Sequence, residues 1–564
     1  MNMRYLFLTI LLLIAISSTL AVEKKEEPKL ILQITVDQLR ADLPATVLDR
    51  LPEGGFKYLY NQGVVYENAH HRHANTETVV GHATLATGAD PSEHGMIGNL
   101  WYDKELKRIV YNVEDYRYPL LGSNAGVNKK TEIDPTQAAA STDGRSPSAI
   151  IATTFSDELS MSTNKQAKVF GVSVKDRGAI TMAGHSGKAF WFSKSNGQFV
   201  TSSYYYEAYP NWVNNWNKKS KYKEYANTSW ELTNDISEYM YGEDDDMPYE
   251  TNLPGYGVVF PHNFGAVDNK YFTTFLTLSP VGDELTLDFT KELIIAENLG
   301  SDAITDYLSV SFSSTDYVGH IFGPSSLESE DNLFRLDRTL ANLFRFVDDK
   351  IGLENVLIVF SADHGAPDVP ERLKTFGIDA GYFDLASVDT LSINEVMSNK
   401  FNTTEKLVSG FFHPYVYLND DVIEKYSLDI NEVSRTLAYE LQNQEGIAFA
   451  IASVDLLEGK ISNTELNNSV LRNYNPKRSG EIYIVTEPYW FINEFDGLEV
   501  ASTHGSPWSY DTHVPIIFAG NGISNMTIWR NVETVDVALT LSNYLNIKIP
   551  SASSGQPLIE VLKK

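Results

Sequence analysis

The sequence of 564 residues contains no cysteine. Without thiols, the fold can use neither disulfide bonds nor thiolate metal ligands. Any bound metal ion must therefore be held by histidine, carboxylate or hydroxyl groups. The length exceeds what one ordinary hydrophobic core supports, so we expect one large domain that carries a substantial insertion.

Basic residues are scarce as well. The chain has 45 lysines and arginines against 74 aspartates and glutamates, a formal net charge of −29. Such a surface repels the phosphate backbone of nucleic acids, so we expect no nucleic-acid binding. A site for a small anionic substrate would need its own concentrated positive charge.

Long apolar runs are absent after the N-terminus. Residues 6–16 are apolar except for Thr9, Arg4 precedes them, and Thr19-Leu20-Ala21 resembles a cleavage site. This pattern predicts a signal peptide over residues 1–21 and a periplasmic or secreted mature chain over 22–564. The run is shorter than the roughly 20 residues that span a bilayer, so we expect no stable membrane span after cleavage. A retained anchor is the alternative.

Short apolar strands alternate with helical patterns along most of the chain. Helical spacing connects Leu333 to Val347, and Gly352 stands where a helix C′ glycine is expected. The alternation predicts an α/β sheet with helices on both faces, and ligands bind such sheets at the carboxyl ends of the strands. The expected strands are Leu30–Val36, Val169–Val174, Tyr307–Phe312, Val356–Phe360 and Pro515–Phe518.

Two regions interrupt this pattern. Residues from about 190 to 290 are rich in tyrosine, tryptophan and asparagine, and we expect a cap region beside the site. Within it, the acidic run 243–246 is expected to be a solvated loop rather than a calcium site. Residues from about 375 to 480 carry their own strand, helix and strand, with Asp429 as a helix N-cap, and predict a small inserted α/β lobe.

Metal-ligand side chains gather at the expected strand ends. Three aspartates and three histidines are enough for two zinc sites with three protein ligands each. Taken singly, each has an ordinary explanation as a turn or cap residue, but all lie at candidate ends of one sheet. We expect the cluster at His70, His71 and His73 to hydrogen-bond its loop. The candidate ligands are Asp37, Asp316, His320, Asp363, His364 and His504.

A helix N-terminus is predicted near Thr78. Polar residues from Asn75 lead into a short apolar segment that ends at Gly88. Unpaired N–H groups at a helix start favour an anion, and the Thr78 hydroxyl would be exposed beside it. The alternative is that Thr76 or Thr78 only caps the helix.

Seven motifs in order make the chain, from about residue 29, resemble the alkaline phosphatase superfamily, in particular its PafA-type (phosphate-irrepressible) branch with a threonine nucleophile. This resemblance implies a mostly parallel central sheet and broad-specificity hydrolysis of phosphate monoesters. The motifs are the strand ending in Asp37, Thr78-Val-Val-Gly-His82, Pro91-Ser-Glu-His-Gly-Met-Ile-Gly-Asn99, Lys175-Asp-Arg177, Asp316-x3-His320, Asp363-His364-Gly365 and Thr503-His504-Gly505-Ser506-Pro507.

The resemblance also implies roles for these residues. Asp316, His320 and His504 match the ligands of one zinc ion. The second ion matches Asp37, Asp363 and His364 together with the Thr78 oxygen. Catalysis would pass through a phosphothreonine at Thr78, and the phosphoryl oxygens would be held by Asn99, Lys175 and Arg177.

The pair Lys175 and Arg177 indicates whether the substrate is a phosphate monoester or a diester. Two residues apart on extended backbone, both side chains would point to one side and converge on one phosphoryl group. A monoester offers them one more charged oxygen than a diester does. The nearest alternative is a phosphodiesterase or nucleotide pyrophosphatase of the same superfamily, and a zinc- or phosphate-binding scavenger is the non-enzymatic one. We expect small-molecule phosphate monoesters as partners, and a monomer.

Overall fold

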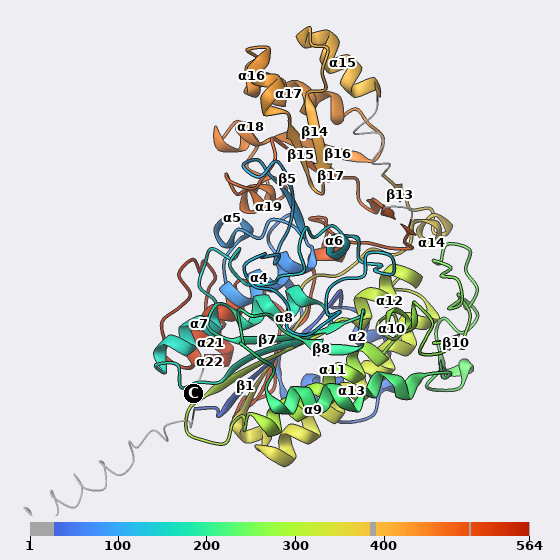
Figure 1. The fold of residues 1–564 in the computed structure, drawn as a ribbon, viewed down its shortest axis with the longest axis vertical. Helices are drawn as coiled ribbons and strands as arrows, with labels where there is room; N and C mark the ends of the chain where they lie inside the picture. Colours follow the sequence, from blue (N-terminus) through green and yellow to red (C-terminus); the bar gives the residue numbers. More distant parts are fainter. Residues whose placement is uncertain (1–26, 384–390, 496–497, 563–564) are drawn as a thin grey trace, which may run out of the picture.

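The central element of the fold is a nine-stranded sheet with the order β22-β2-β21-β12-β1-β11-β6-β7-β8 (Figure 1). The structure, a computed structural model, describes residues 27–383, 391–495 and 498–562, so the predicted signal peptide lies outside the described residues. The neighbours from β12 to β7 run parallel, whereas β21 and β8 are antiparallel to theirs. The strands are β1 (Leu30–Val36), β2 (Val64–Tyr66), β6 (Val169–Ser173), β7 (Lys188–Ser193), β8 (Gln198–Val200), β11 (Asp306–Phe312), β12 (Val356–Ser361), β21 (Ile516–Gly520) and β22 (Met526–Ile528).

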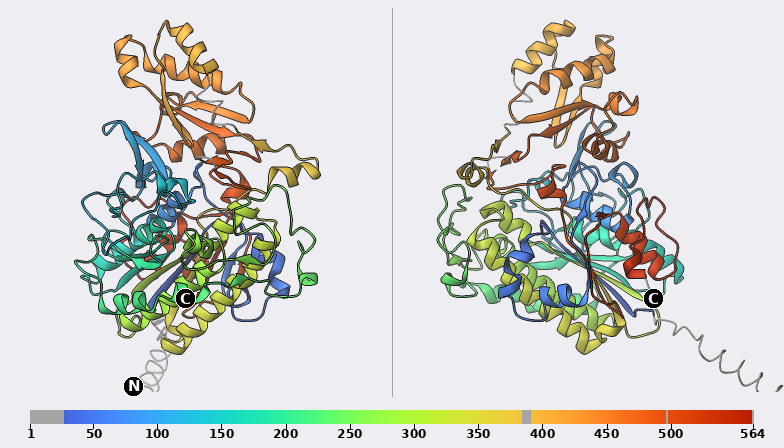
Figure 2. Two further views of the ribbon diagram at one scale, coloured as in Figure 1. Left: turned by 45° about the vertical axis from the view of Figure 1, so that its right-hand side comes forward. Right: turned by 180° about the vertical axis from the view of Figure 1, so that it is seen from behind.

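Both faces of this sheet are covered by helices, because its central strands are apolar on both sides. Leu30, Leu32 and Ile34 of β1 join the core on one face, and Ile31 joins the core on the other. Figure 2 shows the helices on either side of the sheet. One face carries α9 (Asn211–Lys219), α11 (Val281–Ala296) and α13 (Leu327–Lys350), and the other carries α4 (Thr78–Thr87), α7 (Phe155–Ser162) and α21 (Asp536–Tyr544). The predicted fold class is confirmed.

Helix α13 follows the predicted leucine spacing. Leu333, Leu336 and Leu340 are buried in the core, and Gly352 has the positive φ of 85° expected just after the helix. None of the helices in the described part of the chain is both long enough and apolar enough to cross a membrane.

The region expected as a cap, about 190–290, needs a correction. Its first strands, most of β7 and all of β8, belong to the edge of the central sheet. Trp216 and Phe289 pack against Phe199 in the main core, so this aromatic content serves the sheet rather than a separate cap. One carboxylate of the acidic run, that of Asp244, pairs with the distant Arg372 at 3.3 Å.

A separate lobe stands on the carboxyl-end side of the sheet, at the top of Figure 1. Its sheet has the order β14-β15-β17-β16, with strands Val408–Phe412, Tyr415–Leu418, Ile482–Thr486 and Ile447–Ala452. The expected extended segment 411–418 is a hairpin, since β14 and β15 pair antiparallel. Strand β17 lies beyond the expected boundary near 480. The lobe helices include α15 (Leu391–Phe401), α16 (Asp420–Lys425), α17 (Ile430–Leu441) and α19 (Glu465–Asn473), and Asp429 caps α17 as predicted.

Candidate active site

Four neighbouring parallel strands place the candidate ligands together. In the order β12, β1, β11 and β6, their carboxyl ends meet at one edge of the sheet. Asp37 directly follows β1, and Asp363 and His364 follow β12. Asp316 and His320 lie on α12 (Ser314–Phe322), which begins after β11. The expected convergence of these side chains is what the structure shows.

The first ligand group, defined as Asp37, Asp363 and His364, is sealed from solvent. The three side chains are 0% exposed. His364 Nε2 lies 3.4 Å from Asp37 Oδ1 and 3.5 Å from Asp363 Oδ2. Burial opposes protonation of His364, but Asp363 and Asp37 outweigh it and raise the pKa of the imidazole to about 9. Burial, together with Asp316 and Asp363, raises the pKa of Asp37.

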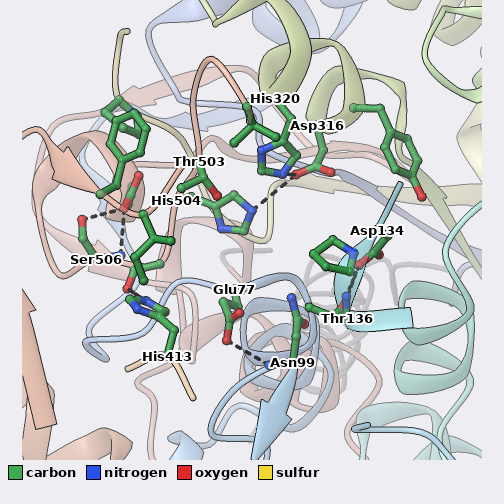
Figure 3. Close-up of a pocket in the computed structure, with 18 of the residues that line it drawn as sticks. Glu77, Asn99, Asp134, Thr136, Asp316, His320, His413, Thr503, His504 and Ser506 are labelled. Carbon is green, nitrogen blue, oxygen red and sulfur yellow. Dashed lines mark hydrogen bonds and ion pairs between the residues drawn. The ribbon is translucent and has the colours of Figure 1, made fainter. Parts of the chain in front are cut away.

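The second ligand group, defined as Asp316, His320 and His504, borders a cavity (Figure 3). Asp316 Oδ1 lies 3.2 Å from His320 Nε2 and 3.5 Å from His504 Nε2. The side chain of His320 is 23% exposed, so this group is reached from solvent. Burial alone would raise the pKa of Asp316, but Lys175 and His320 hold it well below its usual value.

The histidine tautomers test whether metal ions fit. The Nδ1 atoms of His320, His364 and His504 lie 2.7–3.0 Å from the backbone carbonyls of Ser502, Gly365 and Thr76, to which they donate. In a neutral ring, Nε2 then carries a lone pair that points at carboxylate oxygens. Burial lowers the pKa of His504 to about 3, which keeps that ring neutral. Asp37 Oδ1, Asp363 Oδ2 and His364 Nε2 are buried without a hydrogen bond. The carboxylates that raise the pKa of His364 would equally attract a metal cation to its Nε2 in place of the proton. A cation between such acceptors satisfies them, so the residues fit two metal ions.

Thr78 is the first residue of α4, and its side chain points into the site. Glu77 occupies the N-cap position, so the alternative that Thr78 or Thr76 caps this helix is wrong. A Cβ atom at Gly81 would come within 1.9 Å of the Asp363 carbonyl oxygen. Glycine is therefore required for α4 to approach the segment after β12 that carries Asp363. His82, on the same helix, lies 3.1 Å from Asp363 Oδ2.

The cationic side chains meet at the Thr78 hydroxyl. Lys175 Nζ lies 3.4 Å from Thr78 Oγ1, and Arg177 Nη2 lies 3.3 Å from the same atom. Lys175 also pairs with Asp316 and, at 2.8 Å, with Asp37. Both cations are at most 3% exposed. The two cations are therefore buried within the site rather than paired with acids at the surface.

The predicted reason for this convergence needs a correction. Only Lys175 has extended backbone, as the N-cap of α8 (Asp176–Ala183), and Arg177 lies in the first turn of that helix. The start of a helix, rather than the alternation of a strand, aims the two side chains at Thr78. Asn99 completes the set: its Oδ1 accepts from Val79 N at 3.1 Å, and the residue lines the cavity.

Comparisons with known proteins agree with this geometry. The sequence profile of the family described as type I phosphodiesterase / nucleotide pyrophosphatase matches residues 31–507. The chain belongs to this family. It is 34% identical to a Myroides odoratus protein named calcium-transporting ATPase over 97% of each chain. It is 33% identical to alkaline phosphatase PafA of Elizabethkingia meningoseptica over 95% of this chain and 94% of the relative.

A solved structure also shows similarity to alkaline phosphatase PafA. The crystal structure of alkaline phosphatase PafA matches with a TM-score of 0.87 at 33% identity, over 95% of this chain and 99% of the other. The predicted resemblance is confirmed: the protein is a hydrolase of the PafA-type alkaline phosphatase branch.

Some residues of this PafA-type site were not predicted. Asp134 lies on the cavity wall and pairs with Arg177 Nη1 at 2.7 Å (Figure 3). Tyr111 lies 3.3 Å from the same nitrogen. Glu77 Oε2 accepts from the backbone N–H of Asn99 at 2.9 Å. The only sequence signal at Asp134 is the Asp-Pro-Thr start of a short helix, which indicates a cap and nothing about catalysis.

Proposed function

We propose that this enzyme hydrolyses phosphate monoesters, with Thr78 as the nucleophile and two zinc ions held by the two ligand groups. The observation that carries the proposal is the contact of one buried hydroxyl, that of Thr78, with both Lys175 and Arg177. A hydroxyl has no structural need for two buried cations, whereas a phosphoryl group bound beside it does.

The reaction balances through two displacements. The Thr78 hydroxyl loses its proton to solvent and Oγ1 attacks phosphorus, the bond from phosphorus to the ester oxygen breaks, and the alcohol leaves with a proton from solvent. Water then loses a proton and attacks the phosphothreonine, the bond from phosphorus to Thr78 Oγ1 breaks, Thr78 regains its proton, and inorganic phosphate leaves. Arg177, Lys175 and Asn99 bind the non-bridging oxygens, over which the negative charge spreads in the transition state.

Zinc ions bound at the two groups would supply Lewis-acid stabilisation to the attacking and leaving oxygens and lower the pKa of a bound hydroxyl. The chain's own part is to fix the ligands. The carbonyls of Ser502, Gly365 and Thr76 hold the imidazole tautomers, and the backbone N–H of Gln38 donates to Asp363 Oδ1 at 3.2 Å. Histidine-rich ligand sets favour zinc over magnesium.

The proposal favours monoesters over diesters because the cationic pair is complete. A monoester dianion offers three non-bridging oxygens, and a diester offers two. The burial of both Lys175 and Arg177 beside Thr78 supports binding of the extra charge. The deciding experiment measures kcat/KM for an aryl phosphate monoester and its methyl diester on one sample, together with its metal content. Preference for the diester would overturn the proposal.

The same sample tests the metal and the scavenger alternative. We expect two zinc ions per chain, loss of activity on chelation and recovery on adding zinc. Release of many equivalents of phosphate per chain would exclude a scavenger without turnover. Full activity in a sample without transition metal would contradict the zinc assignment.

We also propose that the mature protein is exported after cleavage near Ala21, on the basis of the apolar run at residues 6–16. N-terminal sequencing of the protein from the producing cell tests this. A chain that still begins at Met1 outside the cytoplasm would contradict cleavage.

A further inference from the structure

A cavity of about 120 Å³ lies between the carboxyl edge of the sheet and the lobe, and Arg177, which contacts the Thr78 hydroxyl, contributes to its lining. Asn99, Arg177, Asp316 and His504 contribute to its lining, so the cavity is continuous with the proposed phosphoryl site. Figure 3 shows side chains from the sheet edge on one side of it and His413 and Ser506 on another. A monoester bound at Thr78 places its leaving group in this cavity.

One wall of the cavity is apolar and comes from the lobe. It is formed by the segment that follows β17, with Trp490, Phe491, Ile492, Leu498 and Val500. Trp490 is fixed in place, because a Cβ atom at Gly446 would approach its ring to 2.6 Å and one at Gly381 to 2.8 Å. The backbone at Gly446 and at Gly381 thus packs closely on this ring because neither residue has a side chain. Ile133, Tyr317 and Ile321 face the cavity from the sheet side.

The acidic residues that line the cavity outnumber its lysines and arginines. Among the described residues that line it, Arg177 is the only lysine or arginine. That guanidinium is already engaged by Asp134 and directed at Thr78. Glu77, Asp134 and Asp511 also line the cavity. Beyond the phosphoryl site, an anionic leaving group would therefore meet apolar surface and carboxylates.

We propose that this cavity selects monoesters whose leaving group is apolar and uncharged, such as phenols and apolar alcohols, and disfavours leaving groups that carry a second anion. The inference rests on the proposed phosphomonoesterase activity. It follows because apolar surface gains from covering an aromatic or aliphatic group, whereas a second anion on the leaving group would lose hydration without gaining a lysine or arginine partner from the cavity wall.

The test compares phenyl phosphate, 3-carboxyphenyl phosphate and glycerol 1-phosphate. We expect kcat/KM for phenyl phosphate to exceed that for the carboxylated ester by at least about tenfold, because an unpaired charge in a low-dielectric cavity is costly. Intrinsic differences in leaving-group reactivity cancel when this ratio is compared between variants.

Leu498→Lys places a cation on the apolar wall. We expect it to reduce the phenyl to carboxyphenyl ratio by about tenfold or more. Leu457→Lys is the matched control, because Leu457 belongs to the lobe, is 62% exposed and does not line the cavity. This control should leave the ratio unchanged. An equal shift in both variants, or none in Leu498→Lys, would overturn the proposal.

Trp490→Ala removes the largest apolar group of the wall. We expect it to lower kcat/KM for phenyl phosphate about tenfold while glycerol 1-phosphate changes little. If the variant does not fold, Ile133→Ala on the opposite side makes the same test with a smaller expected loss. Equal losses for both substrates would count against the inference. If no substrate yields more than one equivalent of phosphate, the proposed function fails instead.

Discussion

The carboxyl edge of the central sheet and the inserted lobe contribute to one site in different ways. The edge supplies groups that are almost entirely buried, with Thr78, Lys175 and Arg177 at most 3% exposed. The lobe supplies an apolar wall, with Trp490 half-buried, and contributes no candidate metal ligand among the described residues. Buried, charged groups with fixed partners suit chemistry that is common to every substrate, and apolar surface suits discrimination between substrates.

From this contrast we expect substitutions in the two regions to have different effects on the kinetics. Changes at the sheet edge should alter turnover of all phosphate monoesters by the same factor. Changes in the lobe wall should alter the ratio between substrates. The variants below test that separation, beginning with the largest expected effect.

Thr78→Ala should lower kcat/KM by at least about 10⁴-fold for every monoester, because removal of a nucleophile removes the pathway that the rest of the site supports. Steady-state rates for phenyl phosphate and glycerol 1-phosphate measure this. Thr78→Ser keeps a hydroxyl and should keep part of the activity. Near-normal turnover by the alanine variant, or acid-trapped phosphate on another residue, would refute the assignment.

The Lys175→Ala, Arg177→Ala double variant should lower monoester kcat/KM far more than diester kcat/KM. Charge-assisted contacts contribute on the order of 1.5–3 kcal/mol each, which is roughly ten- to more than a hundredfold in rate per contact. The measurement is the ratio of an aryl monoester to its methyl diester. Equal losses would leave the phosphatase chemistry standing but remove the cationic pair as the cause of monoester preference.

The contrast also explains what could be predicted from the sequence. Residues at the sheet edge follow strands or begin helices, so short motifs such as Asp363-His364-Gly365 indicated both the strand ends and the candidate ligands. Helix α8 shows the limit: the motif located Lys175 and Arg177, but the periodicity argument gave the wrong backbone. Local sequence does not show where a chain turns from strand to helix to within one residue.

The pocket wall could not be predicted in the same way. Trp490 lies far along the chain from Ile133, and only the fold brings both to one cavity. Asp134 acts on Arg177, which is 43 residues away in sequence. A carboxylate before a proline indicates a helix cap in any sequence, and its second oxygen acquires a catalytic neighbour only through tertiary contact.

Asp134→Asn should lower monoester kcat/KM roughly tenfold, a part of the hundredfold that misplacement by about 1 Å can cause. Burial would raise the pKa of Asp134, but Arg177 and Lys175 outweigh it and hold that pKa well below its usual value, so the group pairs as an anion. Asparagine can still cap the short helix α6 (Pro135–Ala138) while the charge is lost. Asp134 is thus a positioning residue for Arg177.

A double-mutant cycle separates positioning from a structural role. In an Arg177→Ala background, Asp134→Asn should cost little more. Asp115→Asn is the matched control, since Asp115 is 7% exposed, pairs with Arg117 at 2.7 Å and does not line the cavity. A full tenfold loss that persists without Arg177 would show that Asp134 acts in another way.

The smallest effect is expected at His413, a lobe residue that contacts the loop of His504 directly. His413 Nε2 donates to the carbonyl oxygen of Gly505 at 3.0 Å, next to the candidate ligand His504. Gly505 has a positive φ of 117°, and a Cβ atom there would approach the His413 ring to 2.7 Å, so loop and lobe are closely fitted. His413→Ala should lower kcat/KM about two- to tenfold, because one hydrogen bond contributes about 0.5–1.5 kcal/mol.

The pattern of this loss matters more than its size. Since the contact acts on the loop of His504, the loss should be equal for phenyl phosphate and glycerol 1-phosphate, and the variant should lose activity to a chelator faster than the parent enzyme. His413→Gln can present an amide N–H to the same carbonyl and should recover part of the activity. Should His413→Ala instead change the ratio between the two substrates, the lobe would act here as part of the apolar wall. In that case His413 would act on selectivity like the rest of the lobe. Its proposed role in positioning the loop of His504 would then be wrong.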